Sequence, residues 1–294
     1  MELIMYLVDA FTDKKFSGNQ AAVIPDGRKL TDKAMQNIAT ELKLSETAFV
    51  QKVDDDNYKV RFFTPTQEVD LCGHATIATF YTLVEKGYIN GIEGNKKRYY
   101  QHTKAGKLYV DVYCNDKGIE KVVMEQKKPE VIEKDINITE LASSMNIEEY
   151  EMDLDERHLN PEIISTGLPD IIVPIKNKEI LDNLIIDKEK VKKLSKKLGV
   201  TGIHAFTIFE DKIYCRNFAP LVGIDEEAAT GTSNGALFYY MRKNHIMNTN
   251  EITVNQGESL NRPSKIICKI SDDNPEIIEV GGLASIILEG IIHP

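Results

Sequence analysis

A nearly uncharged stretch around residue 80 constrains the fold more than any other part of the chain. From Ala75 to Val84 no residue carries a charge, and large apolar side chains fall on every side of the helix that this stretch would form. A helix that is apolar all round is a buried helix. We therefore expect the rest of its domain to surround it, and Gly87 to end it.

The turn before this helix has the features of an anion site. The first N–H groups of a helix lack partners within it, and the helix dipole is positive at that end. Gly73, His74 and Ala75 occupy these positions. We expect them to face a cleft and to bind a carboxylate there.

A second copy of this pattern lies nearer the C-terminus. Gly231, Thr232 and Ser233 open another mostly apolar helix after a small polar turn. Upstream, an Arg-x-Phe-x-Pro run begins at Arg61 and again at Arg216, 155 residues later. The remaining matches, at spacings of 149, 157 and 158 residues, are Gly18–Pro25 with Gly167–Pro174, Thr47–Val50 with His204–Thr207, and Gly73 with Gly231. Four matches in the same order predict two copies of one domain.

The periodicity of the remaining segments predicts an α+β fold. Each copy has short strands, hairpin turns and one amphipathic helix, at Thr31–Leu42 and at Asp187–Leu198. We expect each to form a curved, mostly antiparallel sheet around its apolar helix. The first domain would span residues 1–118, completed by a strand at about 281–294, and the second 119–280, with a charged crossover at 127–157. The longer predicted strands of the second half are Ile163–Ile175 and Ile277–Leu288.

Composition narrows the functional classes. The chain of 294 residues is 42% hydrophobic and 28% charged, as in ordinary globular proteins, and its net charge of −10 argues against nucleic-acid binding. The N-terminus lacks the pattern of a signal peptide, and no stretch is long enough for a membrane span. No metal-ligand spacing is found among the four cysteines or among His102, His158, His204, His245 and His293, so we assign no metal. We expect a cytoplasmic protein with free thiols and a small-molecule ligand.

The motifs together resemble those of the PhzF-like isomerases of phenazine biosynthesis. The resemblance covers nearly the whole chain and rests on Ser17–Asn19, Leu44–Val50, Leu71–Thr76, Phe218–Pro220 and Thr230–Thr232. It implies the diaminopimelate epimerase-like fold, with two duplicated domains related by a pseudo-two-fold axis. It also implies a cofactor-independent isomerase that moves a proton on a small cyclic or amino-acid-like carboxylate, often as a homodimer.

The resemblance makes Glu46 and His74 the first candidates for catalysis. A carboxylate can take a proton from an activated carbon and return it elsewhere, provided that burial raises its pKa toward neutrality. Position alone favours a solvent-facing Glu46 at the start of a strand, and it leaves His74 open to a structural role in the turn. The resemblance favours Glu46 as the acid/base, and His74 as a group that hydrogen-bonds the substrate or shuttles a proton.

Glu227 and Asn19 are further candidates. Glu227 stands where the family has the aspartate of an Asp-Pro-x-Thr-Gly-Ser run, and Ala228 and Thr232 replace its proline and serine. Such changes alter the reach of a group by about an ångström, which can matter greatly for rate. Glu227 is otherwise one member of an acidic turn. Asn19 follows a turn glycine and is also a common turn residue for local reasons.

Cys72 distinguishes this chain from its relatives by fold. Proline racemase and diaminopimelate epimerase use two cysteines across a cleft, one at the position of Cys72. The partner position here is Ala228, so we exclude a two-cysteine mechanism and interpret Cys72 as a small buried residue. Two alternatives stay open: a racemase or epimerase that uses Glu46 with His74 or Glu227, and a non-catalytic protein that binds a small carboxylate.

Overall fold

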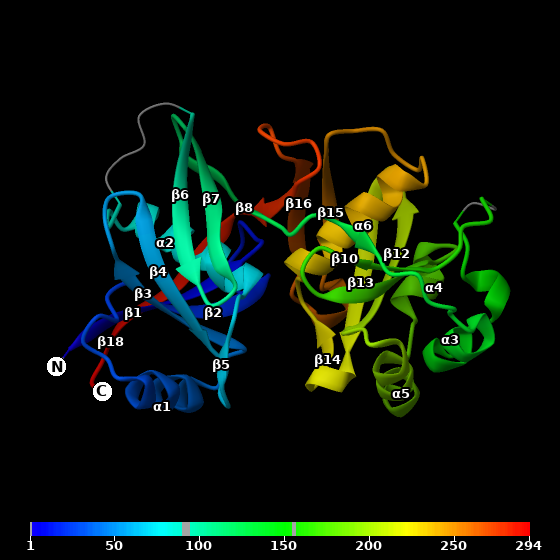
Figure 1. Ribbon diagram of the computed structural model, residues 1–294, viewed down its shortest axis with the longest axis horizontal. Coiled ribbons are helices and arrows are strands. Elements are labelled where there is room, and N and C mark those ends of the chain that lie inside the picture. Colours follow the sequence, from blue (N-terminus) through cyan, green and yellow to red (C-terminus); the bar gives the residue numbers. More distant parts are fainter. Residues whose placement is uncertain (1, 90–94, 155–156) are drawn as a thin grey trace. The chain divides into compact units, whose positions relative to one another are not determined.

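Two units, each with one helix enclosed by a sheet, make up the chain. The computed structural model describes residues 2–89, 95–154 and 157–294. Unit 1 comprises Met1–Glu125 and Gly281–Pro294, and unit 2 comprises Gln126–Val280 (Figure 1). Residues 155 and 156 of the predicted crossover lie outside the described residues.

Unit 1 contains one mixed sheet. Its elements in chain order are β1 (Leu3–Ala10), β2 (Asn19–Ile24), α1 (Asp32–Leu42), β3 (Glu46–Lys52), β4 (Asn57–Phe63), β5 (Glu68–Val69), α2 (Gly73–Glu85), β6 (Lys96–Thr103), β7 (Gly106–Asn115), β8 (Gly118–Glu125) and β18 (Ala284–Ile292). The strands pair in the order β18, β1, β2, β3, β4, β6, β7, β8, and only β2–β3 and β4–β6 are parallel. Helix α2 contacts strands from both ends of this order, including β18, β1, β7 and β8, so the sheet wraps around it (Figure 1).

Unit 2 repeats this arrangement. Its elements are β9 (Glu130–Val131), α3 (Ile138–Met145), β10 (Glu162–Ser165), β11 (Pro169–Pro174), α4 (Lys178–Asp182), α5 (Lys188–Leu198), β12 (Gly202–Phe209), β13 (Lys212–Ala219), β14 (Ile224–Glu227), α6 (Gly231–Lys243), β15 (Glu251–Gln256) and β16 (Ser264–Ile270), before β17 (Ile278–Gly282). The strands pair in the order β9, β10, β11, β12, β13, β15, β16, and the two parallel pairs, β11–β12 and β13–β15, take the places of those in unit 1. The predicted duplicated α+β fold is confirmed.

The predicted domain boundary and two predicted strands differ from the structure, and one strand was not predicted. The boundary falls after Glu125, not at 118/119, because β8 pairs with β7 along most of its length. The predicted strand Ile163–Ile175 is an antiparallel hairpin, β10 and β11, and Ile277–Leu288 is divided between β17 and β18. Strand β6 was not predicted from the sequence. Its inward residues include Tyr99 and Gln101, so it lacks the aliphatic alternation that marks most strands.

Helix α2 is buried on nearly every side, as predicted. Only Tyr81 and Val84 of its mid-section are partly exposed. Three threonines satisfy their hydroxyl groups within the helix, because each donates to the carbonyl oxygen four residues earlier at 2.6–2.8 Å. Polar side chains thus lie in an apolar environment without unpaired donors.

The two Arg-x-Phe-x-Pro runs have the same structural role in both units. Arg61 forms a two-point ion pair with Glu68 of β5 at 2.7 and 2.8 Å and lies over Phe63. Arg216 forms the same contact with Glu226 of β14 at 2.8 Å and lies over Phe218. Bidentate geometry fixes the short strand against its neighbour, which explains why the motif occurs twice.

The register of the sheets corrects one predicted match by one residue. Phe63 pairs with Thr47, and its counterpart Phe218 pairs with Ile203. Thr47 therefore corresponds to Ile203 at a spacing of 156, not to His204 at 157. A shift of one residue moves every side chain of a strand to the opposite face, so the correction decides which residues of the two units are equivalent.

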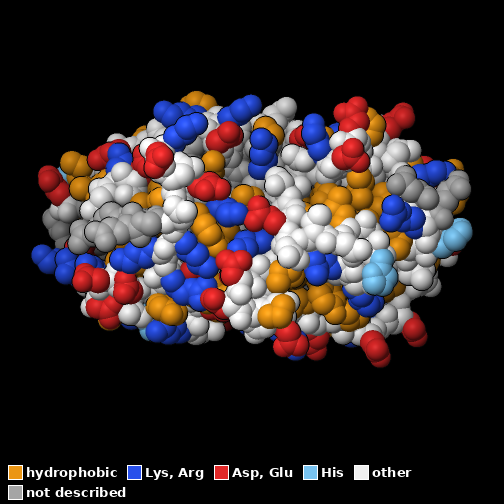
Figure 2. Space-filling view, turned by 90° about the horizontal axis from the view of Figure 1, so that it is seen from above, with side chains coloured by type: hydrophobic (Ala, Val, Ile, Leu, Met, Phe, Trp, Pro, Cys, Tyr) orange, Lys and Arg blue, Asp and Glu red, His pale blue; other side chains and the backbone are white. Residues whose placement is uncertain are grey.

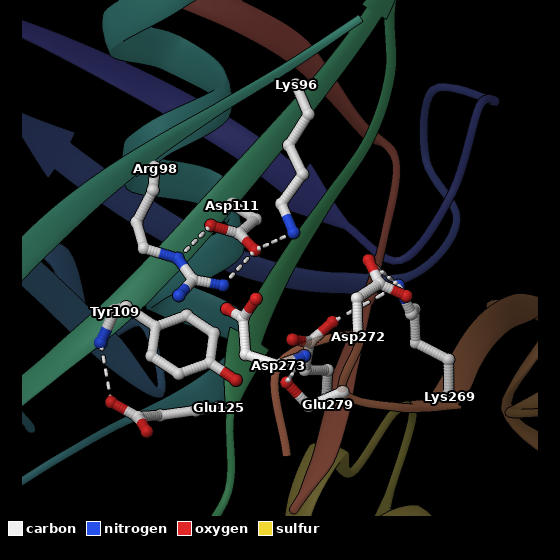
Figure 3. A network of polar contacts seen from close by, with 10 residues as sticks. Lys96, Arg98, Tyr109, Asp111, Glu125, Lys269, Asp272, Asp273 and Glu279 are labelled. Atoms are coloured by element: carbon white, nitrogen blue, oxygen red, sulfur yellow. Dashed lines mark hydrogen bonds and ion pairs between the residues drawn. The ribbon is translucent and has the colours of Figure 1, made fainter. Parts of the chain in front are cut away.

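Charged side chains are paired within each unit. In unit 1 the fully buried Asp111 accepts from Arg98 at 2.7 Å and from Lys96 at 2.8 Å (Figure 3). In unit 2 Lys269 contacts Asp272 at 3.0 Å and the buried Glu279 at 3.5 Å. On the face that Figure 2 shows, basic and acidic side chains are interspersed. Among the described residues, no helix is long and apolar enough to cross a membrane.

We predict that shortening a buried side chain of α2 to alanine destabilises the protein far more than the same change at the next, partly exposed residue. Phe80 is fully buried, with its ring 5.9 Å from Tyr58 and 6.0 Å from Tyr99. Phe80→Ala should lower the free energy of unfolding by about 3–5 kcal/mol, since it leaves a cavity. The partly exposed Tyr81→Ala is the control and should cost clearly less in urea titrations. Equal losses would contradict the enclosed position of α2.

Candidate active site

Three elements of unit 1 bring the predicted residues together. Strands β2 and β3 are parallel, with Ala21 opposite Glu46, so Asn19 and Glu46 lie at the same edge of the sheet. Helix α2 starts there too, with Cys72 as its N-cap residue and His74 in its first turn. Parallel pairing of two strand starts beside a helix start therefore assembles a group of side chains that are distant in sequence.

His74 is the centre of this group. Its Nε2 lies 3.0 Å from Glu46 Oε2, and its Nδ1 lies 3.2 Å from Asn19 Nδ2 and 3.5 Å from Cys72 Sγ. The His74 side chain is 7% exposed and that of Glu46 16% exposed. In the placement shown, the Asn19 amide donates to Nδ1, which leaves the ring hydrogen on Nε2, toward Glu46. A second proton on Nδ1 requires the amide to turn over and present its oxygen.

The charges of the pair follow from this geometry. Burial alone favours the neutral imidazole, but contact with Cys72 and Glu46 outweighs burial and raises the pKa of His74 well above its ordinary value. Burial also raises the pKa of the Cys72 thiol, whereas the pKa of Glu46 is lowered, so Glu46 is the more readily ionised of the two neighbours of His74. These shifts favour a carboxylate beside an imidazolium, and in that state the Asn19 amide is turned so that its oxygen accepts from Nδ1–H.

The predicted rise in the pKa of Glu46 is wrong for the protein without substrate. Burial does favour the neutral acid, but the charge of His74 and hydrogen bonds from Cys72 and Ser45 outweigh it, and the pKa of Glu46 is lowered. The sequence pointed to burial and did not reveal that the cation would lie in direct contact. Glu46 is therefore available as a base at neutral pH.

The start of α2, where we predict an anion site, has no side-chain cap. Cys72 makes no side-chain capping bond, so the positive end of the helix is not neutralised by a cap. Gly73 is partly exposed, whereas Ala75 is fully buried. Binding of a substrate carboxylate at Gly73 and Ala75 stays a prediction.

In unit 2 the predicted residues separate into outward and inward groups. Gly231 and Thr232 are partly exposed at the start of α6, but Ser233 is buried and donates its hydroxyl to Asp170. The Ser233 hydroxyl thus has a partner within unit 2, and binding of substrate at Ser233 stays a prediction. Glu227 is half-buried at the end of β14, where its carbonyl oxygen accepts from Gln256 at 2.9 Å. Roles for Glu227, Gly231 and Thr232 at the site of Glu46 stay predictions.

Sequence reasoning missed a buried polar cluster beneath α6. Asn217 donates to His204 Nδ1 at 3.2 Å and lies 3.2 Å from Ser233 Oγ, and Ser233 in turn donates to Asp170. Burial raises the pKa of Asp170 to about 6 and lowers that of His204 to about 4. Asp170 was visible as a lone acid within the apolar run Pro169–Pro174, which is the signal that could have found the cluster.

The chain is similar to known proteins over nearly its whole length. A family model described as "Phenazine biosynthesis-like protein" (PhzC-PhzF) matches residues 8–290. A Clostridium acetobutylicum protein that carries the name of an isomerase is 37% identical over 289 residues, 94% of this chain and 92% of the relative. The crystal structure of a Bacillus anthracis phenazine biosynthesis protein of the PhzF family matches with a TM-score of 0.85 and 28% identity, covering 100% of both chains. A probable proline racemase from Agrobacterium radiobacter K84 has a TM-score of 0.64 at 12% identity, covers 99% of this chain and 92% of its own, and shows the fold alone.

We predict that the protonation of His74 depends on Glu46. In the wild type, nitrogen-15 NMR should show His74 as imidazolium at pH 7 and His204 as neutral, since their pKa values are shifted in opposite directions. Glu46→Gln removes the neighbouring anion, so the pKa of His74 should fall while the resonances of His204 stay unchanged. A His74 titration that is insensitive to this substitution would show that the ion pair is not formed.

We predict that Asp170 makes stability depend on pH. Its pKa is raised from 3.8 to about 6, so its folded form prefers the proton. The contribution is favourable below the ordinary pKa and is lost as pH rises toward 6, at a cost of about 3 kcal/mol at 1.36 kcal/mol for each pKa unit. Relative to wild type, Asp170→Asn should therefore gain stability between pH 3.5 and pH 7 in urea titrations. Parallel pH curves for the two proteins would rule this out.

Proposed function

Because this chain belongs to the phenazine biosynthesis-like (PhzC-PhzF) family, we propose that it is an isomerase that moves a proton on a small carboxylate by acid/base catalysis through Glu46. The substrate class is that of small cyclic or amino-acid-like carboxylates, and the proton transfer needs no cofactor. The single observation that carries the proposal is the 3.0 Å contact between Glu46 and His74 at the start of α2.

Glu46 has the ionisation state and the surroundings that a general base needs. Contact with His74 lowers its pKa, so the carboxylate is unprotonated at neutral pH, and its surroundings limit competition from water. A carboxylate in such a place can take a proton from a carbon activated by a neighbouring unsaturated or carbonyl group. The protonated acid can then return that proton to a second carbon of the same substrate, which makes the reaction an isomerisation.

His74 keeps Glu46 ready for this step and supplies positive charge. A proton that leaves carbon places negative charge on the substrate, and a fixed imidazolium and the N-terminus of α2 stabilise that charge. Asn19 holds the ring from its other nitrogen, at 3.2 Å. The ring therefore needs little reorganisation during the reaction.

The short distance within the pair argues for one proton shuttle and against a two-base racemase built on Glu46 and His74. Two bases that act on opposite faces of one carbon each lie about 3–3.5 Å from it, so they are roughly 6–7 Å apart. The Glu46 and His74 atoms are 3.0 Å apart and act as one acid/base unit. Inversion at a carbon would need its second base from elsewhere, for which Glu227 is the remaining candidate.

The remainder of the proposal rests on the family. We include a cytoplasmic homodimer, and a contribution from Glu227, Gly231 and Thr232 to substrate binding. The ligand class that the family resemblance implies makes small amino-acid-like carboxylates the first compounds to test.

We predict that isotope exchange identifies both the reaction and its base. The protein is incubated in deuterium oxide with a panel of small cyclic and amino-acid-like carboxylates, and deuterium uptake is followed by NMR. Glu46→Gln should slow exchange at least about 100-fold, which is the scale of general acid/base catalysis. Glu41→Gln, on the exposed face of α1, is the matched control and should exchange at the wild-type rate.

The pattern of products separates the alternatives. Deuterium at a second carbon supports the isomerase, and inversion at the carbon that loses its proton supports an epimerase. Tight binding of a carboxylate without exchange would support a binding protein. Exchange by Glu46→Gln at the wild-type rate would remove Glu46 as the base.

A further inference from the structure

The residues around His74 combine three kinds of metal ligand in one place. Glu46 offers a carboxylate oxygen, Cys72 a sulfur and His74 a ring nitrogen, and these three atoms all lie within 4.8 Å of one another. Within the described ranges, this is the one group of three such residues with that spacing. From this geometry we infer that Glu46, Cys72 and His74 bind a thiophilic divalent cation of the Zn²⁺ type, and that its binding blocks proton transfer by Glu46.

The donor atoms lie within reach of one tetrahedral ion. With Zn–S of about 2.3 Å and Zn–N and Zn–O of about 2.0 Å, tetrahedral ligands are about 3.3–3.5 Å apart. His74 Nε2 lies 3.0 Å from Glu46 Oε2 and 3.9 Å from Cys72 Sγ. The same sulfur lies 3.5 Å from Nδ1, so binding of one ion by Cys72 and Nε2 requires rotation of the Cys72 or His74 side chain. Two of the ligands belong to the same helix start and the third to the strand beside it, so no backbone segment has to move.

An unsatisfied atom points to a missing ligand. Glu46 Oε2 is buried and accepts no aligned hydrogen bond from the described residues, although His74 Nε2 is 3.0 Å away. A buried carboxylate oxygen without a donor is costly, and a cation between the two side chains would satisfy it. Without a metal the ring proton faces this oxygen, and a bound cation would take the place of that proton.

The type of donor selects the type of cation. Sulfur and imidazole ligands favour Zn²⁺, Co²⁺ and similar ions, whereas Mg²⁺ and Ca²⁺ take oxygen ligands. Three protein ligands leave a fourth position for water or for a carboxylate. Asn19, at the other nitrogen of His74, would present its oxygen to the ring N–H and orient it, the usual outer-shell arrangement of a histidine ligand.

The consequence for catalysis rests on the proposed function. Once Glu46 and His74 are bound to the ion, the carboxylate cannot accept a substrate proton and the ring cannot carry its charge. The cation is therefore an inhibitor of proton transfer. The rate of proton transfer would then fall as the concentration of free thiophilic ions rises.

The test uses Co²⁺ as the probe on the whole chain of 294 residues, reduced and without substrate. Wild type should bind one Co²⁺ per chain with a thiolate-to-cobalt charge-transfer band in the near ultraviolet, and Zn²⁺ should displace it. Cys72→Ser should lose the band and bind at least about tenfold more weakly, since it loses one of three ligands. Cys114→Ser, at a partly exposed thiol of β7, is the matched control and should keep both band and affinity.

Two outcomes would overturn the inference. One is wild-type protein that shows no charge-transfer band at saturating Co²⁺, and the other is a band that persists in Cys72→Ser or disappears in Cys114→Ser. Where Cys72→Ser fails to fold by circular dichroism, His74→Asn and Glu46→Gln take its place, and each should weaken binding while the band remains. Co²⁺ binding is measured without any reaction, so a protein that binds Co²⁺ but exchanges no substrate proton would disprove the proposed function and leave the metal site intact.

Discussion

The burial of an uncharged helix is the constraint on which each unit depends. A helix such as α2, apolar on nearly every side, is stable only when strands surround it, and its threonine hydroxyls are satisfied by its own carbonyls. An enclosing sheet requires crossover connections, and these produce the two parallel strand pairs in each unit. The start of the helix then lies at the edge where parallel strands begin, which is where Asn19 and Glu46 lie.

The two units use the same framework with different polar contents. The paired arginine and glutamate recur in both, with nearly equal distances, because the short strand needs the same anchor twice. Around the central helix they diverge. Unit 1 places its polar group at the edge, as Asn19, Glu46 and His74, whereas unit 2 buries Asp170, Ser233 and His204 beneath the helix start. The two copies therefore share the ion pair that holds the short strand and differ in the polar residues around the central helix.

Catalysis and metal binding compete for one set of side chains in our two proposals. An acid/base pair must be buried enough to exclude water and close enough to share a proton, and these conditions also suit a thiophilic cation. Cys72, which lacks the cysteine partner used by relatives of this fold, has its sulfur 3.5 Å from the His74 ring. In this position Cys72 can act as a metal ligand, which a buried apolar residue cannot do.

The sequence alone determined much of this protein. The uncharged run from Ala75 to Val84 determined a central helix, the spaced Arg-x-Phe-x-Pro runs determined two copies, and the family motifs singled out Glu46 and His74. These features are local or repetitive, so they can be read without knowing which strands pair. Strand β6 was not predicted because its buried residues include Tyr99 and Gln101, so it lacks the alternation of aliphatic residues that marks most strands.

Only the tertiary structure decided what depends on contact between distant residues. The register of β12 and β13 moved the match of Thr47 from His204 to Ile203, because pairing, not local similarity, fixes which face a side chain takes. The pKa of Glu46 fell where burial alone predicts a rise, because His74 lies 3.0 Å away. Burial can be inferred from a pattern of apolar residues, but the sign of a neighbouring charge at 3 Å requires the fold.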